Sequence, residues 1–350
     1  MKNRKQPAVI QSTSDLAKQL NLSRWTISRV LNGHAGVAPE TARRVQESMQ
    51  KLGFSPNSLA RGLRKGTTNI IGICIPEIEG FHLGQKLEFL RQALADEGWH
   101  AMVAMTNGER MEEGEALSRF RTLHAAGVIL FASQLTPRCT PVRQFHETGI
   151  PLIFVDPMTP PPKGSLCVDR SVGMREATLH LLELGHRHIA TLGLTGESRY
   201  TRSRRKGVAE AYEERGLNPA RFVREIALPE STDSFYARGR ASAALVWNNP
   251  VRPTALLAVN DRVAIGLLDG LRELRVRVPE DLSVIGYDNM EMTAFLSPQL
   301  TTIDTKPDDL ISKATERLLQ SVHANGESER ASILIPSRLL LRASTARARD

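Results

Sequence analysis

The 350-residue sequence is poor in the residues that mark several classes of protein. Its three cysteines, Cys74, Cys139 and Cys167, are scattered, odd in number and without metal-site spacing. They predict reduced thiols and no bound metal. No apolar run approaches the roughly 18 residues of a transmembrane helix, and the basic N-terminus has no apolar signal segment. The sequence therefore predicts a cytoplasmic protein with no membrane partner.

The motifs of nucleotide enzymes and hydrolases are also absent. The sequence contains no G-x-G-x-x-G, no G-x-x-x-x-G-K-[ST] and no G-x-S-x-G, and the glycine-containing stretch GLTGES at 193–198 fits none of them. We therefore predict neither an enzyme nor a cofactor. An enzyme that converts a nucleotide or sugar is the alternative from a different class, and turnover would reveal it. A secreted solute-binding protein is a second alternative, which export would reveal.

Positive charge, by contrast, is abundant at one end of the chain. The net charge is +8, and residues 1–65 carry 12 Lys or Arg against 3 Asp or Glu. The remaining residues are close to neutral. A concentrated basic segment is typical of a protein that binds a polyanion such as nucleic acid.

Residues 12–33 read as two short helices joined by a tight turn. Ser12 and Ser23 are natural N-caps for the first and the second helix. Asn21 stands where the chain must turn, and Asn tolerates left-handed backbone angles. The pattern predicts a helix-turn-helix, in which the second helix enters the major groove of DNA.

The second of these helices has two different faces. Ile27, Val30 and Leu31 form an apolar stripe that faces the first helix. The opposite side presents Arg24, Trp25, Ser28 and Arg29. Arginine and tryptophan on one exposed face suit base edges, where charge and apolar surface both find partners. The alternative is that Trp25 folds back and packs beside the third helix.

A third helix and a hinge follow. Pro39 opens the helix, and Val45, Met49 and Leu52 form its apolar stripe. The stretch FSPNSLARGLRKG then predicts a short, basic, marginal helix with a leucine at its tip. Such a segment is suited to folding on DNA and pushing the leucine between base steps. A plain linker between domains is the alternative.

From residue 70 onward, short apolar runs alternate with helical stretches. The alternation predicts parallel sheets with helices on both faces, and the length suits two such lobes. Ligands in this architecture bind where the carboxyl ends of strands face a crevice. Several predicted strands end in polar residues there, which are Asp156, Asn260, Asp261 and Asp288.

The residues from Ser12 to Gly66 resemble the DNA-binding domain of the lactose-repressor (LacI/GalR) family of bacterial transcription regulators. The resemblance rests on SDLAKQLNLSRWTISRVLNG and VAPETARRVQESMQKLGFSPNSLARGLRKG. It implies base contacts from Arg24, Trp25 and Arg29. It implies DNA-backbone contacts from Ser23, Thr26, Ser28 and Asn32, and hinge contacts from Asn57, Ala60 and the minor-groove residue Leu63. The family usually has Gly at the position of Asn21, and a Trp at position 25 is uncommon.

The rest of the chain resembles the family's regulatory domain, which is similar to periplasmic sugar-binding proteins. LLELGHRHIATLG, PTALLAVNDRVAIGLLDGLRELRVRVPEDLSVIGYDN and LTTIDTKPDDL carry this resemblance. It implies that an effector, a sugar or sugar derivative, binds in a cleft lined by His82, Asp156, Arg204, Asp261 and Asp288. His82 stands where Phe is common in the family, and Arg170 stands where Asn is common.

Each of these residues also has a purely structural interpretation. Asp261 is a possible N-cap of a helix over 261–273, Arg204 a solvated side chain, and Asp288 a residue that orders its own turn. His186 and His188 are expected to satisfy a loop and not to bind a metal.

Together, the sequence predicts an all-α helix-turn-helix domain at 1–54, a hinge at 55–66 and a two-lobe α/β effector-binding and dimerisation domain at 67–350. The predicted function is a regulator, most simply a repressor, whose affinity for a double-stranded DNA operator depends on the effector. Its predicted state is a homodimer, because residues after the last family motif are too few for a tetramerising helix. A regulator that responds to a purine or another metabolite is the alternative within this class.

Overall fold

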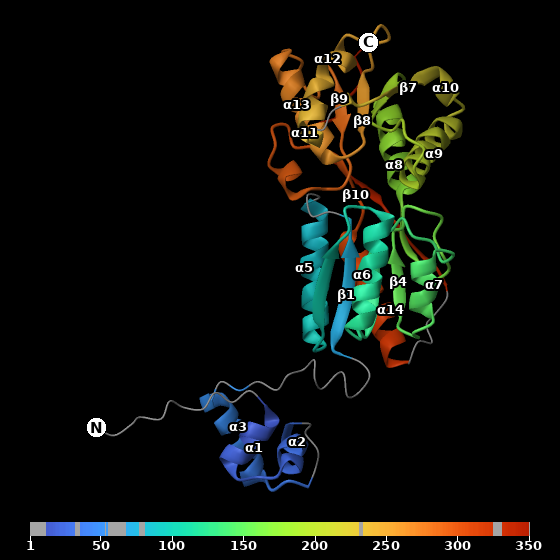
Figure 1. Ribbon diagram of the computed structural model, residues 1–350. Coiled ribbons are helices and arrows are strands. Elements are labelled where there is room, and N and C mark those ends of the chain that lie inside the picture. The colour runs from blue at the N-terminus through green and yellow to red at the C-terminus, as the bar shows by residue number, and fades with distance from the viewer. Residues whose placement is uncertain are drawn as a thin grey trace. The chain divides into compact units, whose positions relative to one another are not determined.

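The computed structural model describes residues 12–31, 36–52, 54, 68–76, 81–230, 234–324 and 331–349. The chain forms two compact units, Met1–Asn69 and Ile70–Asp350 (Figure 1). The predicted hinge at 55–66 lies outside the described residues, and so do Asn32, Asn57, Ala60 and Leu63.

The first unit is a three-helix domain, as the sequence predicts. Its helices are α1 (Thr13–Leu20), α2 (Arg24–Leu31) and α3 (Pro39–Leu52). The side chain of Ser12 accepts a hydrogen bond from the backbone N–H of Asp15, and that of Ser23 accepts one from Thr26 at 3.0 Å. Asn21 has the left-handed φ of 52° that ends α1. The predicted caps and turn are thus confirmed.

The small core of this unit lies between the three helices. Ile27 of α2 is fully buried, and Val30 and Leu31 pack partly against the same core. The predicted stripe of α3 is wrong at Leu52, which is exposed, because the chain turns back after α3 and buries Phe54 in its place. The backbone N–H of Phe54 donates to Met49 at 3.0 Å and fixes this turn.

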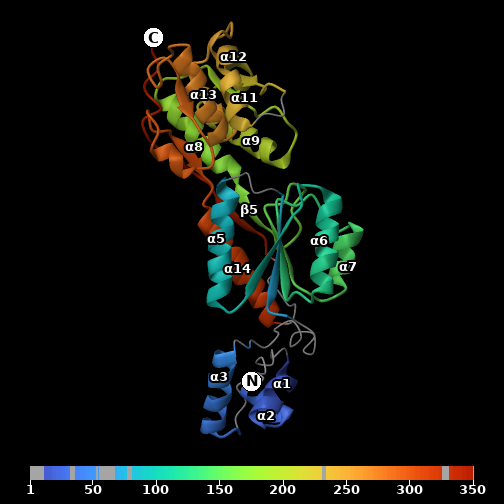
Figure 2. The same ribbon diagram turned by 60° about the vertical axis from the view of Figure 1, so that its left-hand side comes forward.

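The second unit contains two α/β lobes, of which the first is built on a six-stranded parallel sheet. Its strands are β1 (Ile70–Ile75), β2 (His100–Met105), β3 (Gly127–Phe131), β4 (Leu152–Val155), β5 (Leu166–Asp169) and β11 (Ile333–Pro336). Their order is β11-β5-β4-β3-β1-β2. Helices α5 (Phe81–Asp96) and α14 (Pro307–His323) cover one face, and α6 (Arg110–Thr122) and α7 (Thr140–His146) cover the other (Figure 2).

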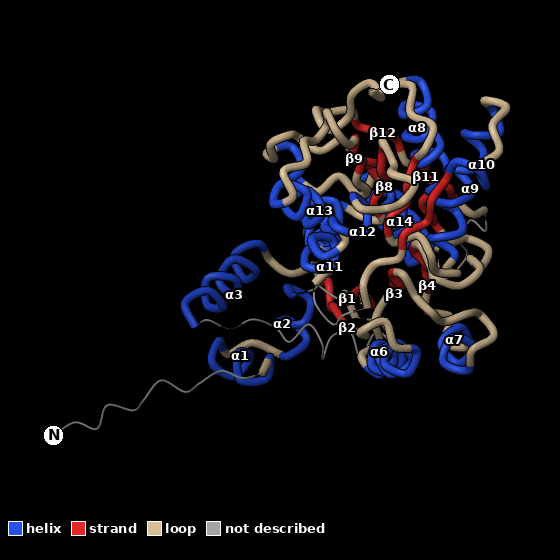
Figure 3. Tube along the Cα trace, turned by 90° about the horizontal axis from the view of Figure 1, so that it is seen from above, coloured by secondary structure: helices blue, strands red, loops and turns tan. Residues whose placement is uncertain are grey.

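The second lobe has a four-stranded parallel sheet. Its strands are β6 (Ile189–Leu192), β7 (Val223–Ile226), β8 (Ala255–Ala258) and β9 (Ser283–Ile285), in the order β7-β6-β8-β9. One face carries α8 (Arg170–Glu183) and α9 (Arg199–Glu214), with α10 (Pro219–Phe222) beside α9. The other face carries α11 (Phe235–Ala241), α12 (Ala243–Trp247) and α13 (Asp261–Glu273), as Figure 3 shows from above.

The chain passes between the two lobes at three places. These are the junctions of β5 with α8, of β10 (Thr302–Asp304) with α14, and of β11 with β12 (Arg338–Leu340). Strands β10 and β12 pair antiparallel and form a two-stranded sheet. The predicted fold class, a helix-turn-helix domain joined to a two-lobe α/β domain, is confirmed. Within the described part of the chain, no helix is long and apolar enough to cross a membrane.

Candidate DNA-reading helix and effector cleft

The outward face of α2 is polar at its first turn and carries a large aromatic side chain. Arg24, Trp25 and Ser28 are exposed, and 63% of Trp25 is accessible to solvent. The alternative in which Trp25 packs onto its own domain is therefore not what the structure shows. An exposed tryptophan beside arginines has no role in the small core of this unit, which α2 reaches through Ile27.

Arg29 and Trp25 stand one turn apart and contact each other. The guanidinium carbon of Arg29 lies 4.8 Å from the centroid of the Trp25 ring. This cation–π contact orients both side chains on one face. The Ser23 and Thr26 hydroxyls, 2.8 Å apart, lie at the N-terminus of the same helix, where backbone N–H groups favour a phosphate. The arrangement suits an element that reads base edges with its side chains and contacts phosphates with its end.

In the second unit, Asp156 lies where β4 ends, in a left-handed conformation with φ of 50°. Its carboxylate is buried and is held by two guanidiniums, in a bidentate contact with Arg170 and in an ion pair of 2.7 Å with Arg199. The Tyr200 hydroxyl donates to the Asp156 carbonyl oxygen. Since Asp156 belongs to the first lobe and Arg199 and Tyr200 to the second, this cluster joins the lobes.

Arg204 is buried one turn further along α9, so the alternative of a merely solvated side chain is wrong. Its guanidinium carbon lies 4.0 Å from the centroid of the Tyr287 ring. Neither its Nε nor the Tyr287 hydroxyl has a hydrogen-bond partner among the described residues, although both atoms are buried. Tyr287 follows β9, so both residues stand at the carboxyl edge of the second sheet or directly above it.

Asp261 is fully buried, and protein groups already satisfy its carboxylate. Oδ2 accepts from the backbone N–H of Met290 at 2.7 Å, and Oδ1 accepts from the Thr302 hydroxyl at 2.6 Å. Burial, and then the neighbouring Asp288 carboxylate, raise the pKa of Asp261 to about 8. The N-cap of α13 is Asn260, whose side chain accepts from Val263, and the alternative that gave this role to Asp261 is wrong. Asp261 anchors the segment after β9 to α13.

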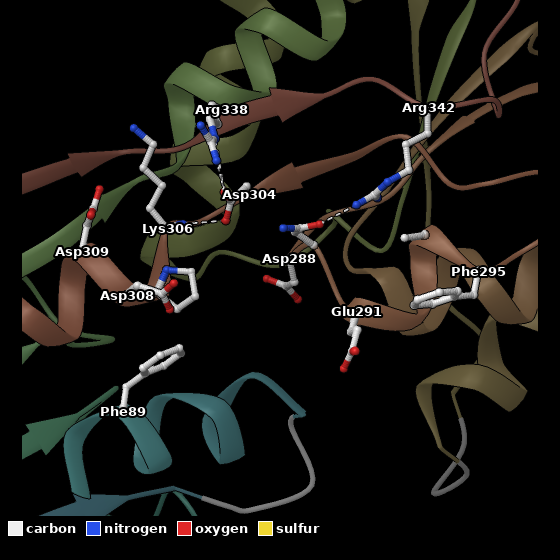
Figure 4. Close-up of a pocket in the computed structure, with 13 residues that line it drawn as sticks. Phe89, Asp288, Glu291, Phe295, Asp304, Lys306, Asp308, Asp309, Arg338 and Arg342 are labelled. Atoms are coloured by element: carbon white, nitrogen blue, oxygen red, sulfur yellow. Dashed lines mark hydrogen bonds and ion pairs between the residues drawn. The ribbon is translucent and has the colours of Figure 1, made fainter. Parts of the chain in front are cut away.

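Asp288 lines a cavity of about 720 Å³ between the two lobes (Figure 4). Phe89 of α5 stands on one wall and Phe295, after the 3-10 turn Glu291–Ala294, on another. The cavity lining is charged with both signs, and its members are Asp288, Glu291, Asp304, Asp308 and Asp309 together with Lys306, Arg338 and Arg342. Asp156, Arg204 and Asp261 do not line it, so the structure does not gather all the predicted effector residues around this cavity.

The remaining predicted residues are placed as follows. His82 lies in the first turn of α5, and its side chain is outside the described part of the structure. His186 is buried, with Nδ1 2.9 Å from the Thr254 hydroxyl and Nε2 3.0 Å from the Ala346 carbonyl oxygen. His188 packs on Phe222. In the described part of the chain no group of three or more His, Cys, Asp or Glu side chains is arranged to hold a metal.

Sequence reasoning missed Arg199, Tyr200 and Tyr287 as site residues. A signal for two of them was present. Arg199 and Tyr200 open the helix that carries Arg204, and residues 200 and 204 lie on one face at i, i+4 spacing. The departure at Arg170, noted from the sequence, marks the residue that occupies the Asp156 carboxylate.

The three-helix unit and the two-lobe unit define a class of protein, the helix-turn-helix transcription regulators with a periplasmic-binding-protein-like domain. Residues 13–57 match the family described as bacterial regulatory proteins, lacI family, and residues 178–345 match the periplasmic binding protein-like domain. The chain thus carries a LacI-family helix-turn-helix domain and a periplasmic-binding-protein-like domain, which is the architecture of DNA-binding transcription regulators.

Individual relatives agree along nearly the whole chain. The HTH-type transcriptional repressor PurR of Aliivibrio fischeri (strain MJ11) is 28% identical over 309 residues, 88% of this chain and 90% of that protein. Catabolite control protein A of Priestia megaterium is 27% identical over 334 residues, 95% of this chain and 98% of that protein. The fold matches the lac repressor dimer bound to operator and the anti-inducer ONPF, with a TM-score of 0.83 at 24% identity, over 96% of this chain and 99% of that one.

Proposed function

We propose that this protein is a cytoplasmic repressor that binds a near-palindromic operator as a homodimer. A small molecule that binds between its lobes is proposed to lower or to raise the affinity of the protein for this operator. The exposed face of α2, with Arg24, Trp25 and Arg29, is the observation that carries the proposal. One helix of eight residues reads few base pairs, and two-fold symmetry doubles the site. Ser23, Thr26, Ser28 and Asn32 are proposed to contact the DNA backbone.

The proposed hinge contacts come from Asn57, Ala60 and Leu63. The sequence supports this assignment, because a short basic helix with a leucine at its tip gains its stability only on DNA. The leucine is expected to unstack a base step in the minor groove. Substitution of Leu63 by alanine is then expected to weaken specific binding more than non-specific binding.

An exposed apolar strand supports the homodimer. Strand β2 stands at the edge of the first lobe's sheet, and Met102, Val103 and Met105 are 39%, 44% and 54% exposed. Met111, at the start of α6, is 75% exposed. An uncovered apolar edge strand is an aggregation hazard unless a partner covers it. A second copy of the chain is the partner that a palindromic operator requires.

The effector is proposed to bind near Asp156, Arg204 and Asp288. Asp261 is proposed to support these residues, and His82 is proposed to line the same cleft. A sugar or sugar derivative is favoured, because hydroxyls pair with carboxylates and guanidiniums. Related structures were determined with bound ribose, from Enterococcus faecium, and with cellobiose. PurR stands among the relatives, so a purine is the second candidate.

Selection of operators from random DNA by the purified protein, followed by a gel-shift titration at several salt concentrations, tests the DNA-binding part. We expect a two-fold symmetric site and an affinity that falls steeply with salt. Analytical sedimentation measures the monomer–dimer equilibrium. Met105→Glu is expected to shift this equilibrium toward the monomer. Binding that shows no sequence preference would contradict the proposal.

A further inference from the structure

Three arginines meet at the junction of the lobes. Their guanidinium N–H groups outnumber the hydrogen-bond acceptors that the chain provides there. Arg170, Arg199 and Arg204 lie beside two aromatic rings, those of Tyr200 and Tyr287. The guanidinium carbon of Arg170 is 3.9 Å from the centroid of the Tyr200 ring, and that of Arg199 is 5.1 Å from it. Arg204 covers Tyr287 in the same way. Two stacked Arg–Tyr pairs thus stand next to each other.

Most of the acceptor capacity at this cluster comes from one carboxylate. Asp156 accepts from Arg170 and from Arg199, so its oxygens are occupied. Arg170 also donates to the Val168 carbonyl oxygen at 3.4 Å. Asp156 therefore does not offer a ligand an open acceptor. A neutral polyol would find guanidinium donors here, but the Asp156 carboxylate is already occupied.

Three buried donors at the cluster have no acceptor among the described residues. They are Nε of Arg170, Nε of Arg204 and the hydroxyl of Tyr287. Arg204 is 9% exposed and Tyr287 is fully buried. A buried donor left without an acceptor is costly, and it points to a group that is supplied from outside the chain. That group must offer oxygen acceptors.

The charge of the cluster favours an anion. Arg170 and Arg199 pair with the Asp156 carboxylate, and Arg204 and Arg170 lie near Tyr287, as does the Asp288 carboxylate. The neighbouring Asp261 has a pKa of about 8 and carries little charge at neutral pH. The first turn of α9 holds no acidic residue, and its N-terminus adds positive potential. Arg170, Arg199 and Arg204 do not line the 720 Å³ cavity, and Asp288 is the acidic residue of that cavity whose charge acts on Tyr287.

We infer that the effector carries an anionic group, a carboxylate or a phosphate, which Arg204 binds with the help of the Tyr287 hydroxyl. The ligand class is then a sugar acid or a sugar phosphate and not a neutral sugar. This inference rests on the proposed effector site and narrows its chemistry. Charge-assisted bonds from a guanidinium fork suit both anions, because each presents paired oxygens.

The test uses the full-length protein and matched pairs of small molecules. Thermal unfolding and calorimetry compare glucose with gluconate and with glucose 6-phosphate, and ribose with ribose 5-phosphate, with inorganic phosphate as a separate probe. We expect at least one anionic compound to raise Tm in a saturable way and to bind about tenfold or more tightly than its neutral partner. The gluconate and phosphate arms separate the two kinds of anion.

Two variants assign the effect to Arg204. Arg204→Gln is expected to remove the preference for the anion. Arg204→Lys keeps the positive charge and is expected to keep part of the preference. The lysine variant also provides a measurement if the glutamine variant does not fold. Arg205→Gln is the matched control, since Arg205 is the next residue of α9 and pairs with Glu197 at 2.7 Å. Its ligand response is expected to match that of the unaltered protein.

The inference is overturned if a neutral sugar binds as tightly as its anionic partner, if none of the anions binds, or if Arg204→Gln leaves the preference unchanged. Gel shifts with the selected operator separate this failure from that of the proposed function. Operator release by a neutral sugar would support the proposed regulator and contradict the inference that its effector is an anion. Absence of operator binding would remove the regulator proposal while leaving anion binding measurable.

Discussion

Arg199 and Asp156 form an ion pair of 2.7 Å between the two lobes, and the same carboxylate is bound on its other side by Arg170. The two arginines differ in what they lose when the carboxylate is removed. Arg170 is buried, whereas Arg199 keeps a hydrogen bond of 2.9 Å to the Pro157 carbonyl oxygen. The Asp156 carboxylate therefore has two roles. It connects the lobes through Arg199, and it neutralises the buried charge of Arg170.

Asp156→Ala is expected to destabilise the protein far more than Arg199→Ala. Removing Asp156 leaves the Arg170 guanidinium buried without its counter-ion, at a cost of about 3–5 kcal/mol. Removing Arg199 leaves the Asp156–Arg170 pair intact. Urea unfolding followed by circular dichroism measures the difference. Arg338→Ala is the control, because its pair with Asp304 is 57% exposed on the arginine side and is worth about 1 kcal/mol or less. Equal losses for the first two variants would contradict this account.

The burial of Asp261 predicts a pH-dependent stability. Its pKa is about 8 in the folded state and has the ordinary value of 3.8 when the chain is unfolded. The folded state therefore holds an additional proton between these values, and this contribution to stability is full below pH 3.8 and is lost as the pH rises toward 8.

The Asp261→Asn variant has no such proton to lose. As the pH rises from 5 to 8, its stability is therefore expected to increase relative to that of the unaltered protein. The difference in unfolding free energy is expected to change by up to about 1.4 kcal/mol per pH unit. Chemical unfolding of both proteins at a series of pH values measures it. Parallel stability curves over this range would show that Asp261 is ionised in the fold.

Gly266 permits the close approach of α11 and α13. A methyl group placed there would lie 1.9 Å from the Tyr236 carbonyl oxygen, so the helices would have to separate. Gly266→Ala is expected to lower the unfolding free energy by several kcal/mol, at or above the roughly 1–3 kcal/mol typical of overpacked cores. Gly196→Ala is the control, because the nearest atom would be 3.9 Å away. A stable Gly266→Ala variant would place the two helices further apart than the structure has them.

Trp25→Ala is expected to leave Tm almost unchanged and to alter base preference at one or two positions in each half-site. The side chain is 63% exposed, so little core packing is lost. Tm and the operator selected from random DNA are the two measurements. A loss of roughly 3–5 kcal/mol would show that the ring is buried in the domain. An unchanged operator with an unchanged Tm would remove Trp25 from DNA recognition.

Much of the fold was predictable because it rests on local signals. The caps at Ser12 and Ser23 and the turn at Asn21 are read from single residues. The helix over 261–273 was predicted with its observed ends, since apolar periodicity and a strand before it define both. Helix α9 begins at Arg199, where Ser198 caps it and its first turn is polar, so no apolar periodicity marks its start.

Other features depend on distant partners and escaped prediction. Strands β5, β10, β11 and β12 exist because each pairs with a strand that is remote in sequence. The same holds for the site. Its residues were predictable by type, but the occupation of Asp156 by Arg170 and Arg199 depends on how the two lobes meet.

The placement of β11 delays the completion of the first lobe during synthesis. Strand β11 at 333–336 pairs with β5 at 166–169, and α14 covers one face of the first lobe's sheet. The first lobe therefore lacks an edge strand and a covering helix until the ribosome has made the intervening second lobe. At typical elongation rates this delay is on the order of ten seconds. Over that interval the apolar face that later receives α14 is open to water and to chaperones.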